Sequence, residues 1–338
     1  MNGFMALSKE RRRGIFEEAS ARLKLPSASI EKDYWVFLAL DGLFSEPSLY
    51  PRLTFKGGTS LSKVWKIINR FSEDIDVVIE RSSLGYCDDR DPENASTTSA
   101  QKKLSRELVE SCAECIRKEI LPVLERYLSS TSCQVIADPA DKDGQTLLVR
   151  YESILGPKPS AYITPSVRIE LGARSGNEPV ETAEIRPLVD EALPGMSWAK
   201  TAGVRALDPR RTFLEKAFLI HEECHKPVDK ARKTRLSRHL YDVFQLIQRG
   251  YAEKAVRDTE LFTRVLKNRR TVFRYSWIDY EGLCISSLDI CPRDDCMEQW
   301  RTDYRSLCEE MIYGTPPDFN QLVSGIRAFA NRFMSQGD

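Results

Sequence analysis

Two aspartates separated by one residue, Asp74 and Asp76, are the side chains in this sequence best suited to binding a metal ion. Ile75 lies between them and the apolar run Val77-Val78-Ile79 follows. Because side chains alternate along a strand, we expect both carboxylates on one face and Ile75 in the core. Adjacent like charges are unfavourable without a cation, and Mg²⁺ typically takes one or two carboxylates plus phosphate oxygens. The two aspartates could also be solvated acids at a strand edge. The apolar run that follows indicates a buried strand, which argues against acids without a ligand.

A glycine pair precedes these acids in the sequence. A short strand predicted at 52–55 leads to Gly57-Gly58, and Thr59-Ser60 begin a helix predicted to end near residue 68. Glycine permits positive φ and a close approach of the backbone to a ligand, and a helix N-terminus offers free N–H groups with partial positive charge. With two hydroxyls added, the segment suits a triphosphate. A glycine pair before a helix is weak evidence when it stands alone.

Glu170 is the best candidate for a third acid that would join this pair. It lies in the apolar segment 167–171, where a lone carboxylate needs a partner. A metal ion held together with Asp74 and Asp76 would be such a partner. Arg168 or Arg174 could instead form a structural salt bridge with Glu170, and the residues leave both alternatives open.

Two charged positions stand out in the second half of the chain. Lys216 lies beside the apolar stripe of a predicted helix, where it could cover that stripe or reach a phosphate. Asp242 follows Arg238 by four residues on the next helix, and as an exposed pair the two would contribute only about 0.3–0.5 kcal/mol. The residues alone assign neither Lys216 nor Asp242 a function.

Three other patterns are less specific. Residues 230–238 hold five cations in nine positions, which suits either a nucleic-acid backbone or a solvated segment at a helix start. Arginines and aromatic residues alternate over 269–280, which favours an aromatic core over a surface that stacks bases. His221 and His225 share one helix face, but with no nearby Asp or Cys to complete a ligand set a zinc site is not predicted.

The elements that must position these residues predict an α+β protein in two parts. Helices are expected over the first 40 residues, a long polar surface loop over 82–101, and a long helix over 102–128 that is interrupted near Pro122. Strands are predicted at 134–137, 146–151, 166–171, 180–185 and 203–207, and almost all of the rest is helical. We therefore predict a mixed α/β domain with N-terminal helices at 1–208 and a helical domain at 209–338.

The composition is that of an ordinary globular chain. Its 338 residues include 50 basic and 50 acidic ones, so net charge provides no general attraction to nucleic acid. No stretch approaches the roughly 18 apolar residues of a membrane span, and no signal peptide is recognised. The nine cysteines include one CxxC, Cys112 to Cys115, within a helical pattern. Free thiols without an export signal are typical of a cytoplasmic protein.

The combined pattern of glycines and acids resembles the AbiEii/AbiGii toxin family within the DNA polymerase β-type nucleotidyltransferases. The order is GG[ST]-x-L, about a dozen residues, and then R-x-S-x-D-h-D, where h is hydrophobic. The matching residues are Gly57, Gly58, Thr59, Leu61, Arg70, Ser72, Asp74 and Asp76. The segments 31–34, 215–217 and 238–242 are similar to shorter family motifs, so the resemblance spans about residues 28–248.

This resemblance implies a minimal nucleotidyltransferase lobe with a mixed sheet, followed by a C-terminal helical lobe. It also implies a toxin of a toxin–antitoxin or abortive-infection system that is neutralised by a separate antitoxin, typically one with a winged helix. The implied activity is transfer of NMP from an NTP, with Mg²⁺ or Mn²⁺, to an RNA acceptor such as the tRNA 3′ end. Transfer to a small molecule or a protein side chain, and a non-catalytic NTP-binding regulator, remain the alternatives.

Individual roles follow from the resemblance only at matching positions. Asp74, Asp76 and Glu170 would hold the metal, and Lys216 would contact the triphosphate beside the glycine turn. The predicted nucleotide-binding residues are Gly57, Gly58, Thr59, Ser60, Ser72 and Lys216. Asp242 would be the acid of the last motif, in which His239 stands where family members often have Asp.

Overall fold

The computed structural model describes residues 3–72, 74–156, 164–196, 201–227, 230 and 235–334. These residues form two compact units. The first comprises Met1–Val64 and Phe71–Leu207, and the second comprises Trp65–Arg70 and Asp208–Asp338. The short segment Trp65–Arg70 therefore leaves the first unit, joins the second, and ends four residues before Asp74.

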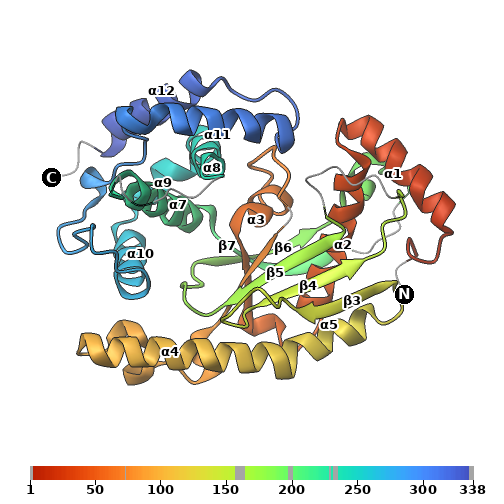
Figure 1. Cartoon of the computed structure of the whole chain (residues 1–338), viewed down its shortest axis with the longest axis horizontal. Helices are drawn as coiled ribbons and strands as arrows, with labels where there is room; N and C mark the ends of the chain where they lie inside the picture. Colours follow the sequence, from red (N-terminus) through yellow and green to blue (C-terminus); the bar gives the residue numbers. More distant parts are fainter. Residues whose placement is uncertain are drawn as a thin grey trace. The chain divides into compact units, whose positions relative to one another are not determined.

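A mixed sheet of seven strands forms the centre of the first unit (Figure 1). The strands are β1 (Leu53–Lys56), β2 (Ile75–Ile79), β3 (Cys133–Ala137), β4 (Thr146–Tyr151), β5 (Ser166–Gly172), β6 (Val180–Ile185) and β7 (Ala202–Leu207). Their spatial order is β3-β4-β5-β2-β1-β7-β6. The central strand β2 pairs antiparallel with β1 and parallel with β5, so it meets the end of the glycine turn on one side and Glu170 on the other.

Alternating side chains explain these strands. In β5, Val167, Ile169 and Leu171 are buried, whereas Arg168 is partly exposed and Glu170 is exposed. This period of two presents one apolar face to the core. The strands predicted in this half of the chain are confirmed to within about one residue at each end.

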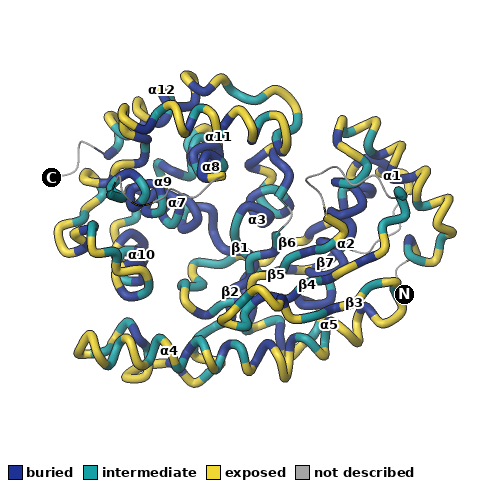
Figure 2. Tube along the Cα trace, viewed as in Figure 1, coloured by how far each residue is buried: buried dark blue, intermediate teal, exposed yellow. Residues whose placement is uncertain are grey.

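Helices cover the sheet of the first unit. They are α1 (Lys9–Leu23), α2 (Ser27–Phe44), α3 (Gly57–Lys63), α4 (Thr98–Cys115), α5 (Leu121–Leu128) and α6 (Leu188–Ala192). α2 is buried on nearly all sides because it packs against α1, α5 and β7, whereas α4 exposes a long outer side (Figure 2). A π-helical turn at Ile116–Ile120 precedes Pro122, and it confirms the predicted interruption of the long helix.

The second unit is helical. Its helices are α7 (Pro209–Cys224), α8 (Ser237–Gln248), α9 (Tyr251–Arg257), α10 (Thr259–Val272), α11 (Met297–Glu310) and α12 (Phe319–Phe329). α7 is the central helix, with contacts to α8, α9 and α10. Among the described residues, no helix is both long enough and apolar enough to cross a lipid bilayer.

The segment Trp65–Arg70 is fastened to the second unit by its backbone. The carbonyl of Asn69 accepts from the N–H of Tyr313 at 3.0 Å, and the N–H of Asn69 donates to the hydroxyl of Tyr241 at 3.2 Å. Arg70 forms an isolated β-bridge with Ile312. The prediction of a helix from 59 to about 68 is therefore wrong at its end, because α3 stops at Lys63 and the following residues pair with other backbone.

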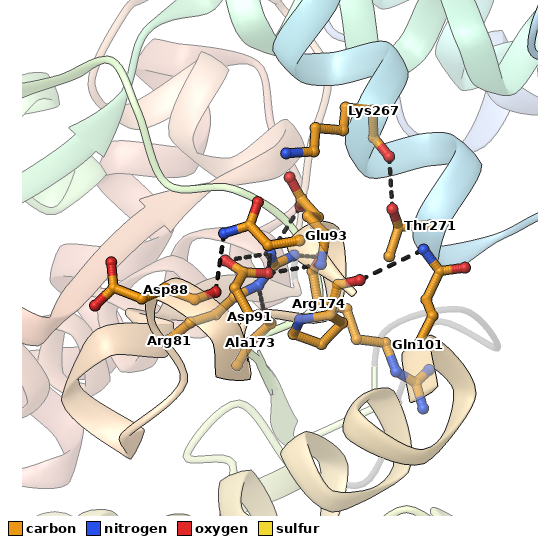
Figure 3. Close-up of polar contacts among 11 residues, drawn as sticks. Arg81, Asp88, Asp91, Glu93, Gln101, Ala173, Arg174, Lys267 and Thr271 are labelled. Atoms are coloured by element: carbon orange, nitrogen blue, oxygen red, sulfur yellow. Dashed lines mark hydrogen bonds and ion pairs between the residues drawn. The ribbon is translucent and has the colours of Figure 1, made fainter. Parts of the chain in front are cut away.

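The predicted polar loop at 82–101 is also wrong in part. Three 3₁₀ turns, Arg81–Leu84, Asp88–Arg90 and Pro92–Asn94, occupy its first half, and α4 begins at Thr98. Figure 3 shows the reason, which is the convergence of acceptors on one guanidinium. Arg81 donates to the carboxylates of Asp91 at 2.9 Å and Glu93 at 2.7 Å. It also donates to the carbonyl of Ala173 at 2.8 Å, which joins this segment to the end of β5.

Candidate active site

The glycine turn and Asp76 are in direct contact. Gly57 has φ of +77°, and an ideal Cβ built on it would lie 1.9 Å from Oδ2 of Asp76 and 2.8 Å from its Cγ. The preceding residue, Lys56, is the register partner of Asp76 in the β1–β2 ladder. Any side chain at position 57 would therefore strain the backbone and displace the carboxylate. The Asp76 carboxylate can occupy this position only because Gly57 has no Cβ.

Asp74 and Asp76 stand on the opposite side of the strand from Ile75. Asp74 immediately precedes β2 and Asp76 lies inside it, and both are partly exposed, whereas Ile75 is fully buried. The structure thus presents two neighbouring carboxylates beside a turn that has no side chain. Oxygen donors in this arrangement fit a hard divalent cation such as Mg²⁺, which needs few protein ligands and takes the rest from phosphate and water.

The hydroxyls near the turn have different environments. The Thr59 hydroxyl donates to the carbonyl of Asp74 and lies 2.9 Å from the Ser72 hydroxyl, so both side chains connect α3 to the start of β2. Ser60 is buried, and its hydroxyl has no hydrogen-bond partner within the described parts of the chain. A buried hydroxyl without a hydrogen-bond partner destabilises the folded protein unless a bound ligand supplies that partner. Among these hydroxyls, Ser60 therefore best suits a contact with a bound phosphate.

Glu170 is next to Asp76 but is engaged elsewhere. The two residues are register partners in the parallel β2–β5 ladder. The Glu170 carboxylate accepts from Nε of Arg168 at 3.0 Å, and Arg168 also pairs with Asp138. Among the described residues, Asp74, Asp76 and Glu170 do not form a cluster of three with all ligand atoms within 4.8 Å of one another. Glu170 would have to leave Arg168 before it could bind the same cation.

In the second unit, Asp242 is the centre of a buried charge network. It is fully buried, and it accepts from Nε of Arg70 at 2.7 Å and from Nη2 of Arg70 at 2.8 Å. Nζ of Lys216 lies 2.9 Å from Oδ2 of Asp242 and 3.3 Å from Nδ1 of His239. Asp242 therefore does not lie on an exposed helix face, and its partners are the motif arginine and the motif lysine.

The pKa values in this network follow from burial and mutual attraction. Burial alone would raise the pKa of Asp242, but attraction to Arg70 and Lys216 holds it well below its ordinary value. Burial lowers the pKa of Lys216, although Asp242 opposes that shift. Burial and the neighbouring Lys216 charge lower the pKa of His239 well below its ordinary value. These shifts favour the neutral form of His239 and the ionised form of Asp242.

The aromatic core expected over 269–280 is found only in part, because Tyr280 is buried whereas Phe273 is exposed. The Glu222 carboxylate accepts from the Tyr280 hydroxyl at 3.0 Å and pairs with Arg269, and the Glu222 carbonyl accepts from Nε1 of Trp277. These contacts place the polar ends of the aromatic residues around one buried acid. Residues 231–234 of the basic run at 230–238 lie outside the described residues. In the rest of the run, Nζ of Lys230 lies 4.2 Å from the centre of the Trp277 ring.

A mixed sheet that carries two acids beside a glycine turn, in a chain with a helical unit, fits the class of nucleotidyltransferases. Residues 38–325 match the nucleotidyl transferase AbiEii toxin family of type IV toxin–antitoxin systems, and the chain belongs to that family. This confirms the resemblance recognised in the sequence, and it makes the protein the toxin partner of an antitoxin and a user of NTP.

A solved structure supports the fold. The chain is similar to MenT4, a nucleotidyltransferase toxin from Mycobacterium tuberculosis H37Rv, with a TM-score of 0.54 and 16% sequence identity. The similarity covers 98% of this chain and 91% of MenT4. At this identity the likeness confirms the predicted α+β architecture and carries no residue roles. Comparison with curated protein sequences finds no match.

The sequence interpretation missed the partner of Arg70. This arginine belongs to the family motif, but the motif gives no indication that its side chain binds an acid 172 residues later. The one available signal was Asp242 in an apolar helix, where a carboxylate requires a cation.

Proposed function

We propose that this nucleotidyltransferase transfers NMP from an NTP to the 3′ end of an RNA, with tRNA as the acceptor, in a reaction that requires Mg²⁺ or Mn²⁺. The observation that supports it best is the contact between Gly57 and Asp76, which places a carboxylate where a polyphosphate could approach the backbone. In this proposal the reaction takes place in the cytoplasm, and the neutralising antitoxin contains a winged helix.

Asp74 and Asp76 would hold the cation in this proposal. When bound, the cation would neutralise charge on the phosphates and lower the pKa of the acceptor hydroxyl. The acceptor oxygen would form a bond to the α-phosphorus while the bond to the β-phosphate bridging oxygen breaks, and pyrophosphate would leave. Gly57, Gly58 and Ser60 would position the phosphates next to the acids.

Glu170 and Lys216 have conditional roles. Once the Glu170 carboxylate has separated from Arg168, it would accept the proton of the acceptor hydroxyl. The separated carboxylate would also be able to contact the cation. Lys216 would contact the triphosphate only through a change of partner, since its ammonium now faces Asp242 and His239. We therefore assign Asp242 a positioning role, because its charge is fully satisfied inside the second unit.

The deciding experiment incubates the protein with each α-³²P-labelled NTP, Mg²⁺ and total RNA, and then resolves the labelled products. Label on tRNA is expected, with Asp74→Asn and Asp76→Asn reducing transfer by at least about 10³-fold. Glu184→Gln, an exposed acid on β6, is the matched control and should keep full activity. Label on a small molecule or a protein in RNA-free lysate would favour a different acceptor. NTP binding without release of pyrophosphate would favour a regulator.

Glu170→Gln separates its two possible roles. If Glu170 takes part in catalysis, kcat should fall by about 10²-fold or more while the protein stays folded. If its only role is the ion pair with Arg168, then Glu170→Gln and Arg168→Met should leave kcat unchanged, since both side chains are substantially exposed.

A further inference from the structure

His221, His225 and Asp289 form a cluster in the second unit that the proposed transfer reaction does not use. Their potential ligand atoms all lie within 4.8 Å of one another, and they are the only such group of three among the described residues. The two histidines are one turn apart at the end of α7, and their ring centres are 4.2 Å apart. Asp289 comes from the irregular segment that connects α10 to α11, so the cluster joins parts of the chain far apart in sequence.

The hydrogen bonds and close contacts of the two imidazoles show which ring nitrogens face Asp289. Nδ1 of His225 donates to the His221 carbonyl at 2.9 Å, so in the neutral ring the lone pair is on Nε2. This Nε2 lies 3.3 Å from Oδ2 of Asp289. Nδ1 of His221 accepts from the N–H of Asp289 at 2.9 Å, so its lone pair also points toward Asp289. Nε2 of His225 therefore faces the Asp289 carboxylate, and Nδ1 of His221 faces the backbone N–H of the same residue.

We propose that His221, His225 and Asp289 bind a transition-metal ion of the Zn²⁺ class. The 3.3 Å separation of Nε2 of His225 and Oδ2 of Asp289 matches two ligands about 2.0 Å from one tetrahedral ion. The hydrogen bond from Nδ1 of His225 to a backbone carbonyl is the usual outer contact of a metal-bound histidine. The ion would replace the N–H of Asp289 as the partner of Nδ1 of His221.

The surroundings suit a divalent ion. His221 is buried, and its Nδ1 accepts a hydrogen bond, so this nitrogen carries a lone pair that a metal ion could take up. His225 and Asp289 are partly exposed, with 36% and 55% of their side-chain surface accessible, which leaves an entry path and room for a water ligand. The ion would fasten the segment around Asp289 to α7, and it would be structural because no substrate group is required.

The test uses the full-length, metal-free protein with Co²⁺ as a spectroscopic probe and Zn²⁺ as a competitor. One equivalent of Co²⁺ should bind with visible d–d absorption and without a thiolate-to-cobalt charge-transfer band, although the chain has nine cysteines. His225→Gln and Asp289→Asn should each weaken binding by more than about tenfold. Asp295→Asn, an exposed acid of the same connecting segment, is the control and should bind like the wild type.

A second measurement guards against loss of folding. Zn²⁺ should raise the Tm of the wild type and of Asp295→Asn, but not of His225→Gln or Asp289→Asn, whose Tm values without metal should stay close to that of the wild type. Equal Co²⁺ affinity in all variants, a spectrum dominated by thiolate ligands, or no binding would each overturn the proposal. Transfer activity with Mg²⁺ should be unaffected in these variants, so the proposed function is tested separately.

Discussion

Arg70 and Asp242 are joined by two parallel hydrogen bonds of 2.7 and 2.8 Å, and both side chains are almost completely buried. The ion pair connects two residues that are 172 positions apart in the sequence. Arg70 lies four residues before Asp74. The Arg70–Asp242 ion pair therefore holds the start of the short segment that leads to Asp74 and Asp76. Lys216 adds a second cation to the same carboxylate.

Asp242→Asn should destabilise the protein by about 3–5 kcal/mol, because it leaves Arg70 and Lys216 as two buried cations without an anion. Urea unfolding monitored by tryptophan fluorescence would measure this loss. Asp295→Asn, which removes an exposed carboxylate, should change the free energy of unfolding by less than about 0.5 kcal/mol.

Arg70→Met combined with Asp242→Leu should be less destabilised than the sum of the two single variants, since the double change removes both buried charges together. Additive effects would show that the two residues do not interact. If Asp242→Asn were fully stable but inactive, Asp242 would act on the substrate directly, contrary to the positioning role.

Gly57→Ala should reduce nucleotidyl transfer by about 10²-fold or more, because the added methyl occupies the position of the Asp76 carboxylate. The positive φ should also cost about 1–2 kcal/mol of stability. Gly14→Ala is the matched control: it lies in α1, where an added Cβ meets nothing within 4 Å, and it should retain activity with unchanged or slightly higher stability. A Gly57→Ala enzyme with normal kcat would show that the carboxylate position is unimportant.

The protein should lose stability in mild acid. Burial lowers the pKa of His221 from 6.5 to about 4, and it lowers that of His239 in the same direction. Below pH 6.5 the unfolded chain therefore binds more protons than the folded one, so the free energy of unfolding falls as the pH falls. A loss of about 1–3 kcal/mol is expected between pH 7 and 5.

Urea unfolding in the presence of a chelator at several pH values would measure this slope. His221→Asn keeps an acceptor for the N–H of Asp289 but cannot be protonated, so its stability should depend less on pH than that of the wild type. Identical slopes for the two proteins would exclude His221 as a source of the acid sensitivity.

Arg81→Met should loosen the three 3₁₀ turns that follow β2, since the guanidinium holds the carboxylates of Asp91 and Glu93 and the carbonyl of Ala173 (Figure 3). Amide hydrogen exchange over residues 82–94 should become at least about tenfold faster. Lys103→Met, which changes an exposed side chain of α4, should leave exchange in this segment unchanged. Unchanged exchange in Arg81→Met would mean that packing alone orders the turns.

Local patterns were sufficient to predict most of the fold. Strand alternation such as that of Val167, Ile169 and Leu171 depends only on near neighbours in the sequence, as does the helix interruption before Pro122. The relation of Gly57 to the two acids was also predictable, because β1 and β2 are consecutive strands of the sequence and pair antiparallel. The roles of the individual acids remain predictions.

The remaining features depend on contacts between distant segments. Nothing near Arg70 indicates that its partner is Asp242, and nothing near His225 indicates Asp289. The prediction of where α3 ends was wrong for the same reason, since residues after Lys63 pair with backbone near Ile312. Of the partners expected for Glu170, the structure shows Arg168, which lies two residues away on the same strand.

The membership of Trp65–Arg70 in the second unit has a consequence during synthesis on the ribosome. A nascent chain that has reached Leu207 contains every strand of the sheet and both acids, yet the anion that neutralises Arg70 has not been made. A bare guanidinium cannot be buried alone, so the segment before Asp74 stays unfastened until α8 emerges. The segment that leads to the two acids can therefore take its final position only after α8 has been synthesised.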